Sequence, residues 1–300
     1  MKSVTAKTST LRRAVAVGRV KASTSAIERL QSNDLPKKDV LAVARVAGTY
    51  CAKKTFEIIP YCHPLPVDLV EITFEVGSDC VDIRATVEAV AKTGVEMEAL
   101  TAVSTAALTI YDMLKPIDTG IEIQTVKLES KRGGKRDFPQ RFPEGFQASI
   151  LVTSDGTFEG TREDRSGQVI RVRLEALGLT PGYEVLPDEE STITAALQTL
   201  VQRGIDLVLT TGGTGLGPRD VTVEATRRVI EREIPGIAEA MRAYGQDRTP
   251  YAMLARGLAG VCGRTIIVNL PGSSRGTEES LNAILPGVFH AFAMIRGQGH

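Results

Sequence analysis

Two pairs of charged side chains lie near the ends of one long apolar segment in the first half of the chain. Glu96 and Glu98 flank Met97, and Asp112 precedes Lys115 by one helical turn. A core helix would not tolerate these charges, and a surface helix does not need this arrangement. Carboxylates and an amine placed in this way suit proton transfer on a substrate that carries phosphate groups. The first half is therefore predicted to be an enzyme.

A helix over residues 95–114 would hold both pairs. Its dipole favours the two glutamates in the first turn. Glu98 and Asp112 are 112 − 98 = 14 positions apart, which is about 21 Å along a helix axis. If both ends serve one small-molecule site, that site must combine two subunits. Taken singly, each pair is also explained as ordinary surface charge, and His63 as a core histidine that holds a turn.

Composition limits the class of protein. The chain has 300 residues, enough for two domains, and 36 Lys+Arg balance 36 Asp+Glu, so the net charge is 0. A neutral chain argues against nucleic acid as a partner, and no apolar run approaches the ~20 residues of a membrane helix. None of the 4 cysteines belongs to a C-x-x-C pair, so reduced thiols and a cytoplasmic location are expected.

A stretch rich in charge, Gly and Pro, residues 130–147, predicts a boundary near Pro143, with domains over 1–143 and 144–300. Before it, strand-like and helical segments mix without strict alternation, which predicts an α+β sandwich. These segments are strands over 69–76, 80–89 and 121–128 and helices over 40–54 and 95–114.

After the boundary, strands and helices alternate, which predicts an α/β domain with a mostly parallel sheet and helices on both faces. The predicted strands are 148–153, 183–186, 205–210 and 264–270, and the predicted helices are 166–177, 192–202 and 221–232.

A glycine-rich segment, residues 210–220 (TTGGTGLGPRD), lies between a predicted strand and a predicted helix. Glycines let backbone N–H groups approach an anion closely. The pattern is not G-x-G-x-x-G, because Pro218 replaces the third glycine, and no Gly-Lys-Ser/Thr follows, which excludes a Walker A loop.

Four acids also follow predicted strands, and a parallel sheet would bring them to the same edge. Together with the glycines they suit a nucleoside triphosphate with Mg²⁺. Helix capping or turn formation is the alternative role for Asp164 and Asp188. The four acids are Asp155, Asp164, Asp188 and Asp220.

Five motifs of the first domain resemble the cyclic pyranopterin monophosphate synthase family, which acts early in molybdenum cofactor biosynthesis. The motifs are residues 40–48 (VLAVARVAG), 58–66 (IIPYCHPLP), 92–101 (KTGVEMEALT), 108–113 (LTIYDM) and 133–135 (GGK). The resemblance implies a ferredoxin-like α+β fold and a hexamer built from dimers, with sites at subunit interfaces. It also implies conversion of a cyclic dihydro-GTP derivative to cyclic pyranopterin monophosphate and pyrophosphate, without a cofactor.

Position by position, the family's functional residues match Lys37, His63, Glu96, Met97, Glu98, Asp112 and Lys115. Lys131 and Lys135 could hold the triphosphate tail, and a solvated basic linker is the alternative. The chain departs from the family pattern at Lys38, Arg132 and Arg136.

Six motifs of the second domain resemble the molybdopterin adenylyltransferase family. They are residues 153–155 (TSD), 164–167 (DRSG), 187–189 (PDE), 210–215 (TTGGTG), 219–222 (RDVT) and 269–273 (NLPGS). The resemblance implies transfer of AMP from MgATP to molybdopterin by a trimeric protein. Asp188 and Asp220 match the acids linked to metal and catalysis. The substrate-binding matches are Thr211, Gly212, Gly213, Thr214, Gly215 and Ser273.

Together, the two resemblances predict a bifunctional enzyme with pterin and nucleotide substrates. Mg²⁺ and ATP are the cofactors expected for the second domain. The expected assembly is a homo-oligomer based on a trimer, with a hexamer as one form. Two alternatives remain for the second domain: binding of molybdopterin without catalysis, and a scaffold that clusters pathway enzymes.

Overall fold

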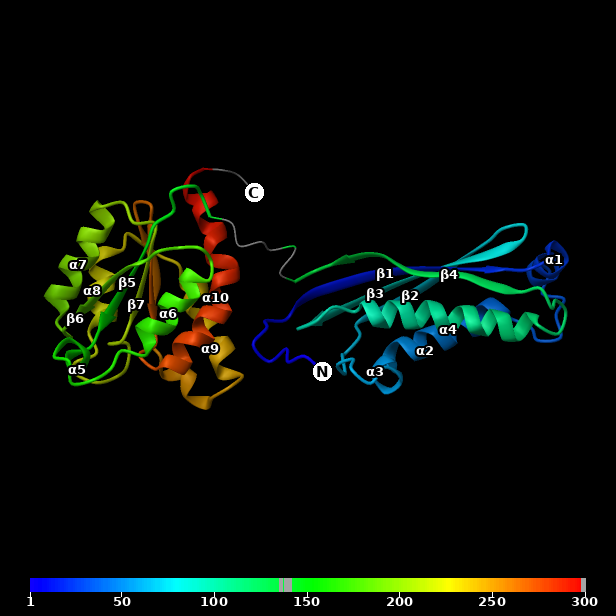
Figure 1. The fold of residues 1–300 in the computed structure, drawn as a ribbon, viewed down its shortest axis with the longest axis horizontal. Helices are drawn as coiled ribbons and strands as arrows, with labels where there is room; N and C mark the ends of the chain where they lie inside the picture. Colours follow the sequence, from blue (N-terminus) through cyan, green and yellow to red (C-terminus); the bar gives the residue numbers. More distant parts are fainter. Residues whose placement is uncertain (135–136, 138–141, 298–300) are drawn as a thin grey trace. The chain divides into compact units, whose positions relative to one another are not determined.

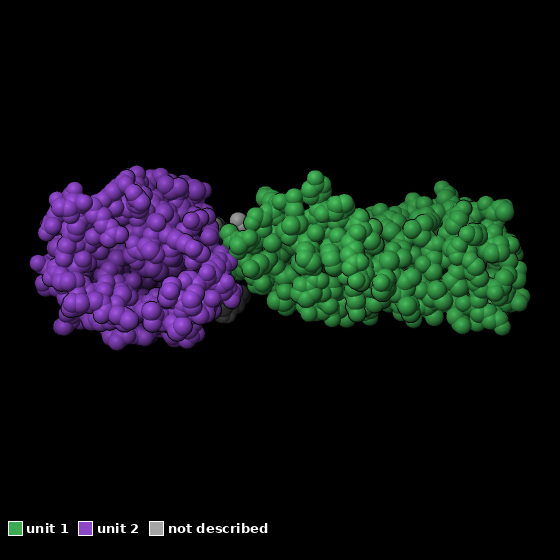
Figure 2. Space-filling view, turned by 90° about the horizontal axis from the view of Figure 1, so that it is seen from below, with its two compact units in different colours: residues 1–138 green, residues 139–300 purple. Residues whose placement is uncertain are grey.

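The computed structural model describes residues 1–134, 137 and 142–297, and the chain divides into two compact units, Met1–Phe138 and Pro139–His300. Figure 1 shows the elements, and Figure 2 gives each unit its own colour. The division falls within the stretch that the sequence marks as a boundary, shortly before Pro143. Among the described residues, every helix is too short or too polar to span a bilayer.

The first unit is an antiparallel sheet with helices packed on one face (Figure 1). Its strand order is β2-β3-β1-β4, and each neighbouring pair is antiparallel. This confirms a mixed α and β unit, while the finer label, ferredoxin-like, stays a prediction. The elements in chain order are β1 (Thr10–Lys21), α1 (Thr24–Gln31), α2 (Val40–Lys53), α3 (Thr55–Ile58), β2 (Leu69–Val76), β3 (Cys80–Ala91), α4 (Glu96–Leu114) and β4 (Glu122–Arg132).

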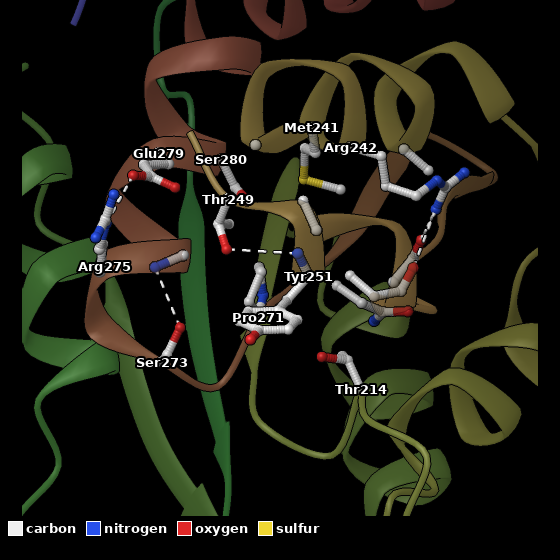
Figure 3. A pocket seen from close by; sticks show the side chains of 17 residues that line it. Thr214, Met241, Arg242, Thr249, Tyr251, Pro271, Ser273, Arg275, Glu279 and Ser280 are labelled. Carbon is white, nitrogen blue, oxygen red and sulfur yellow. Dashed lines mark hydrogen bonds and ion pairs between the residues drawn. The ribbon is translucent and has the colours of Figure 1, made fainter. Parts of the chain in front are cut away.

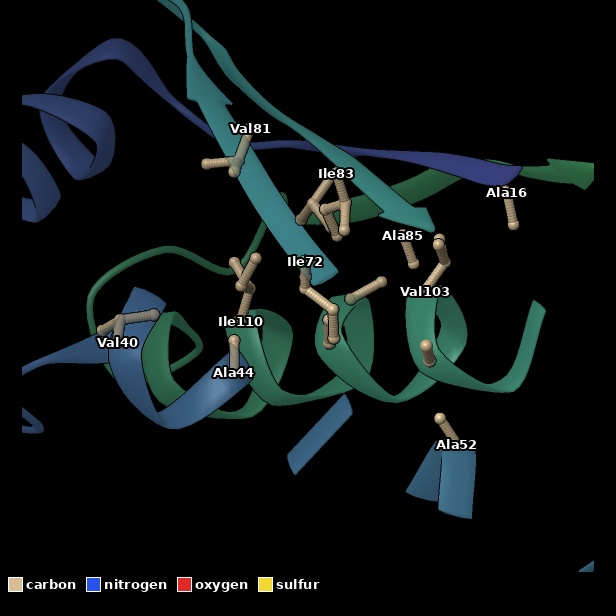
Figure 4. Close-up of a cluster of buried hydrophobic side chains, with 14 of the residues drawn as sticks. Ala16, Val40, Ala44, Ala52, Ile72, Val81, Ile83, Ala85, Val103 and Ile110 are labelled. Atoms are coloured by element: carbon tan, nitrogen blue, oxygen red, sulfur yellow. The ribbon is translucent and has the colours of Figure 1, made fainter. Parts of the chain in front are cut away.

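The core of this unit lies between the sheet and helices α2 and α4 (Figure 4). Ile72, Ile83 and Ala85 of the sheet belong to the same buried cluster as Val103 of α4. At Gly48 of α2, an added Cβ would lie 2.8 Å from a backbone oxygen of α4, so glycine is needed for the two helices to approach this closely. Close packing fixes α4 against the sheet and thereby sets where its charged ends lie.

The second unit contains a six-stranded mixed sheet in the order β6-β5-β7-β10-β9-β8. Strands β6, β5, β7 and β10 are parallel. At one edge, β9 is antiparallel to β10, and β8 is antiparallel to β9. The elements are β5 (Ala148–Thr153), α5 (Asp155–Phe158), α6 (Ser166–Glu175), β6 (Gly182–Leu186), α7 (Glu190–Gln202), β7 (Leu207–Thr211), α8 (Thr222–Val229), β8 (Arg232–Glu233), α9 (Pro235–Gln246), η1 (Pro250–Leu254), β9 (Ala259–Cys262), β10 (Thr265–Leu270) and α10 (Ser274–Ile295).

Helices cover both faces of this sheet, as the sequence predicts. Buried residues of α6, α9 and α10 form the core on one face, and those of α7 and α8 form a second core on the other. The helix predicted over 221–232 is too long, because the chain becomes extended at Ile230 (φ −72°, ψ 141°). Arg232, the first residue of strand β8, then pairs with Val261 of β9, and β8 thereby forms an edge strand of the sheet.

An aromatic cluster holds the beginning of the second unit against its last helix. The ring of Phe142 lies 5.4 Å from that of Phe289 in α10, and the ring of Phe146 lies 4.8 Å from that of Phe292, edge to face. Edge-to-face geometry is favourable for aromatic pairs. The segment before β5 is therefore part of the core of this unit.

Candidate functional site

Helix α4 places two groups of charged residues at its opposite ends. It begins at Glu96, with Glu96 and Glu98 in its first turn, and Lys115 is its C-cap residue. The sequence-predicted helix is thus confirmed, and the groups are separated by nearly the whole helix. Met97, between the glutamates, is 39% exposed.

At the end of α4, the carboxylate of Asp112 lies between two ammonium groups. Lys37 Nζ donates to one carboxylate oxygen at 2.5 Å, and Lys115 Nζ donates to the other at 2.6 Å. The hydrogen bonds from Lys115 and Lys37 lower the pKa of Asp112 to about 2. The hydrogen bond to Asp112 and the charge of Asp112 raise the pKa of Lys115. Asp112 and Lys115 are therefore charged at neutral pH, and Lys115 can donate a proton or bind an anion.

At the start of α4, the two glutamates differ in protonation tendency. Glu98 is 4% exposed, and burial raises its pKa, with a further rise from the charge of Glu96 and an opposing effect of a backbone N–H. Burial also acts to raise the pKa of Glu96, but hydrogen bonds and the charges of Lys131 and Arg12 outweigh it, and the pKa falls. Lys131 Nζ lies 2.8 Å from Glu96 Oε1. One carboxylate is thus held charged, and the other is shifted toward its neutral form.

His63 belongs to the loop after α3. Its Nε2 lies 3.0 Å from the backbone oxygen of Lys2. The neighbouring thiol, Cys62, has a raised pKa because of burial and the charge of Glu98, so this loop lies near the glutamate end of α4. The structure therefore associates His63 with Glu98 and not with Asp112 and Lys115.

Arg12 of β1 is a further cation at the glutamate end, and no motif in the sequence points to it. Its Nε donates to the backbone oxygen of Ala91 at 3.2 Å, and its charge lowers the pKa of Glu96. Gly134, with φ +85°, packs against it so closely that an added Cβ would lie 1.9 Å from Arg12 Nη1. Recognising β1 as a strand that runs beside β3 would have drawn attention to this residue.

The structure places two of the three residues that depart from the family pattern. Lys38 itself does not take a left-handed conformation, which instead occurs at Asp39 (φ 58°), the N-cap residue of α2. Arg132 ends strand β4. Lys135 and Arg136 lie outside the described residues.

In the second unit, the loops after β5 and β6 are locked together by two aspartates. The backbone N–H of Asp155 donates to Asp188 Oδ2 at 3.0 Å, and that of Asp188 donates to Asp155 Oδ1 at 2.9 Å. Arg219, near the end of the glycine-rich loop, binds Asp155 through Nε at 3.0 Å and Nη2 at 2.7 Å. These contacts gather three loops at the carboxyl edge of the parallel strands, as predicted.

Asp188 has one buried carboxylate oxygen, Oδ1, that lacks a hydrogen-bond partner among the described residues. Burial raises its pKa, and the charge of Asp220 contributes to the rise. An unpaired buried acceptor is costly unless a ligand satisfies it. The described residues contain no group of three potential metal ligands, but Mg²⁺ is usually held by one or two carboxylates together with substrate phosphates. Asp188 and Asp220 fit that donor set.

The glycine-rich loop is held in place by contacts on both sides. Asp220 accepts a hydrogen bond from the backbone N–H of Gly217 at 2.7 Å. Arg256 donates to the backbone oxygens of Gly215 and Asp220, both at 2.6 Å. With its carbonyl groups occupied in this way, the loop has a fixed backbone conformation.

The predicted residues at the base of this loop, a buried threonine and two half-buried glycines, serve packing. Thr211 Oγ1 donates to the backbone oxygen of Pro271 at 2.8 Å, which joins the loop to the turn after β10. Gly212 has φ +99°, and an added Cβ would lie 2.0 Å from the backbone oxygen of Thr153. At Gly213 (φ +59°) a Cβ would lie 2.2 Å from Thr222 Oγ1. Only glycine fits at these two positions.

Thr214 and Ser273 line one cavity of about 330 Å³ in the second unit. Figure 3 shows Met241 of α9 on one side of this cavity and Thr214 and Ser273 on the other. Ser273 is also the N-cap residue of α10, where its Oγ accepts from Gly276 N at 3.2 Å. Asp155, Asp188 and Asp220 are not among the lining residues, so the cavity adjoins the glycine-rich loop without including the acids.

Asp164 has a structural role in helix α6. Its Oδ1 accepts hydrogen bonds from Gly167 N at 2.8 Å and from Ser166 Oγ at 3.3 Å, and Tyr183 donates to its other oxygen. Of the two acids for which helix capping was the alternative, Asp164 therefore caps a helix. Asp188 instead joins two loops, and Glu189 is the N-cap residue of α7.

Two family models match the chain. Residues 1–134 match the MoaC family, and residues 149–290 match a family described as "Probable molybdopterin binding domain". A bifunctional protein of molybdenum cofactor biosynthesis from Chlorobaculum tepidum is 42% identical over 301 residues, covering 100% of this chain and 96% of that protein. A protein of the same name from Synechococcus elongatus is 37% identical over 98% of this chain and 97% of its own length.

Each unit also has separate relatives. The cyclic pyranopterin monophosphate synthase of Corynebacterium efficiens is 53% identical over 45% of this chain and 87% of that protein. The crystal structure of the molybdopterin biosynthesis enzyme MoaB from Thermus thermophilus is 49% identical, with a TM-score of 0.48, over 51% of this chain and 97% of that one.

Proposed function

The chain belongs to the bifunctional molybdenum cofactor biosynthesis proteins, and from that premise we propose that its two units catalyse two separate steps of cofactor synthesis. The first unit would convert 3',8-cyclo-7,8-dihydroguanosine triphosphate to cyclic pyranopterin monophosphate and pyrophosphate. The second would transfer AMP from MgATP to molybdopterin.

The βαββαβ order of the first unit supports a ferredoxin-like fold.

The proposal for the first unit rests on the two ammonium groups around Asp112. Lys37 and Lys115 supply positive charge for the phosphates, and the protonated Lys115 can donate a proton during the rearrangement. Glu98 suits the opposite role, because burial raises its pKa and makes its carboxylate a better proton acceptor than an exposed glutamate. Replacing Lys115 with Met should lower pyrophosphate release by about a hundredfold or more. An unchanged rate would remove Lys115 from the mechanism.

The proposal for the second unit rests on the unpaired buried oxygen of Asp188. Asp188 and Asp220 would hold Mg²⁺, which when bound neutralises phosphate charge and orients the nucleotide. The fixed glycine-rich loop would place backbone N–H groups toward the phosphates, and Thr214 and Ser273 would face substrate from the cavity wall.

The variant Asp220→Ala tests this role. It should abolish AMP transfer while molybdopterin still binds. Asp164→Asn is the matched control, because Asp164 caps helix α6, and this variant should retain transfer. A normal transfer rate in Asp220→Ala would contradict the assignment.

A non-catalytic second unit is the alternative function, and the description of its family model as molybdopterin binding favours it. Measuring pyrophosphate release from MgATP and molybdopterin distinguishes the two. Ligand-dependent assembly without release would favour a binding or scaffold role. We further infer that the protein is a homo-oligomer based on a trimer, which sedimentation analysis of the full chain can test.

A further inference from the structure

Arg219 is placed to bind a phosphate, but its guanidinium group is paired with a carboxylate of the same site. It lies near the end of the glycine-rich loop and makes a bidentate contact with the two carboxylate oxygens of Asp155. Its side chain is 61% exposed, and that of Asp155 is 37% exposed. An exposed ion pair of this kind contributes little net free energy and is easily exchanged. Phosphate oxygens match the planar guanidinium equally well and carry more charge.

Asp155 is linked to the proposed metal ligand. Its Oδ1 accepts the backbone N–H of Asp188, and Asp188 Oδ2 accepts the backbone N–H of Asp155. This pair of bonds holds the two carboxylates side by side. As long as Arg219 neutralises Asp155, a cation gains less from approaching Asp188.

We propose that Arg219 is a phosphate-binding residue that Asp155 holds until nucleotide arrives, so that phosphate and cation binding are coupled through exchange of this ion pair. When Arg219 turns to the phosphate, the charge of Asp155 becomes available beside Asp188. This inference rests on the proposed nucleotide site and adds to it two residues, Arg219 and Asp155, with a defined order of contacts.

The test is a pair of titrations on the full chain that should respond in opposite directions. Mn²⁺ alone, followed by electron paramagnetic resonance, reports cation binding. The ATP analogue AMP-PNP in the presence of EDTA, followed by calorimetry, reports phosphate binding without metal. Arg219→Ala should tighten Mn²⁺ binding severalfold, because Asp155 is released, and weaken AMP-PNP binding by about tenfold or more.

Asp155→Asn should give the reverse pattern, with weaker Mn²⁺ binding and tighter metal-free AMP-PNP binding, because Arg219 is freed. Arg228→Ala is the matched control: Arg228 is an exposed arginine paired with Glu190, and its loss should change neither affinity. Loss of both affinities in Arg219→Ala, or no change in either, would overturn the exchange while leaving the nucleotide site in place. Failure of the unaltered chain to bind AMP-PNP with or without metal would overturn the proposed function and this inference together.

Discussion

Mixing two inactive variants of the first unit tests whether its site is shared between subunits. Glu98→Gln removes the carboxyl group at the start of α4 to which we assign proton transfer, and Asp112→Asn removes the carboxylate at its end. Both changes keep the size of the side chain. Since the two residues are 112 − 98 = 14 positions apart, the two groups are about 21 Å apart on one helix. Each variant alone should be almost inactive.

The expected recovery follows from symmetry. If the start of α4 in one copy faces the end of α4 in another, a mixed pair contains one site with both changes and one site with neither. Random association of equal amounts gives mixed pairs in about half of the cases, so about one quarter of the wild-type activity should return. Glu96→Gln mixed with Glu98→Gln is the control. Both changes affect the same end of α4, so every site stays defective.

The assay is pyrophosphate release after the two variants have been co-expressed with different affinity tags. Purification through both tags removes the oligomers that contain one variant alone, so the activity that remains should be at least about one quarter of the wild-type value. Mixed oligomers with no more activity than either parent would refute the shared site, as would a monomeric first unit with full activity.

Gly212→Ala should lower the free energy of unfolding of the second unit by about 3 kcal/mol or more, because a left-handed alanine costs ~1–2 kcal/mol and its Cβ would lie 2.0 Å from a backbone oxygen. Gly178→Ala, also left-handed but in open space, should cost only about 1 kcal/mol in the same urea titration. Glu98→Gln should stabilise the first unit above pH 4.5 and leave it unchanged below, because a carboxyl group with a raised folded-state pKa costs stability only where the unfolded form ionises. Equal destabilisation at pH 4 and pH 8 would contradict the burial argument. Arg256→Lys should destabilise the second unit by about 1–3 kcal/mol and raise KM for ATP, since an ammonium group cannot reach both backbone oxygens of the glycine-rich loop. An unchanged KM would show that the loop keeps its conformation without that contact.

The sequence predicts those helices and strands in which apolar residues recur with a regular period. Strand β2 begins and ends where expected, at Leu69 and Val76, because apolar and polar residues alternate there and Gly77 follows. Helix α4 agrees within one residue. In both elements the spacing of the apolar residues matches the period of the strand or helix that forms.

Strand β1 was missed because its composition is misleading. Its inner face carries small residues, among them Ala14, Ala16 and Gly18, and its outer face carries Arg13 and Arg19. Alanine and glycine have low strand propensity, and pairing with β3 and β4 stabilises the strand. The contribution of Arg12 to the site was lost with it.

Pairwise contacts in the site could be predicted only partly. The spacing of Asp112 and Lys115 implies their ion pair, because both lie on one helix. The contact of Lys37 with the same carboxylate joins positions 75 residues apart, and the ion pair between Arg219 and Asp155 joins positions 64 apart. Contacts of that kind depend on the folded sheet and leave no local trace in the sequence.

The aromatic cluster formed by Phe142, Phe146, Phe289 and Phe292 decides how the second half can be expressed by itself. A fragment that starts at strand β5 would lack the rings of Phe142 and Phe146, and the apolar surface of helix α10 that they cover would be exposed to solvent. Such a fragment should aggregate, and its lack of activity would not test whether the second unit is a catalyst. A fragment for separate study should start upstream of Phe142.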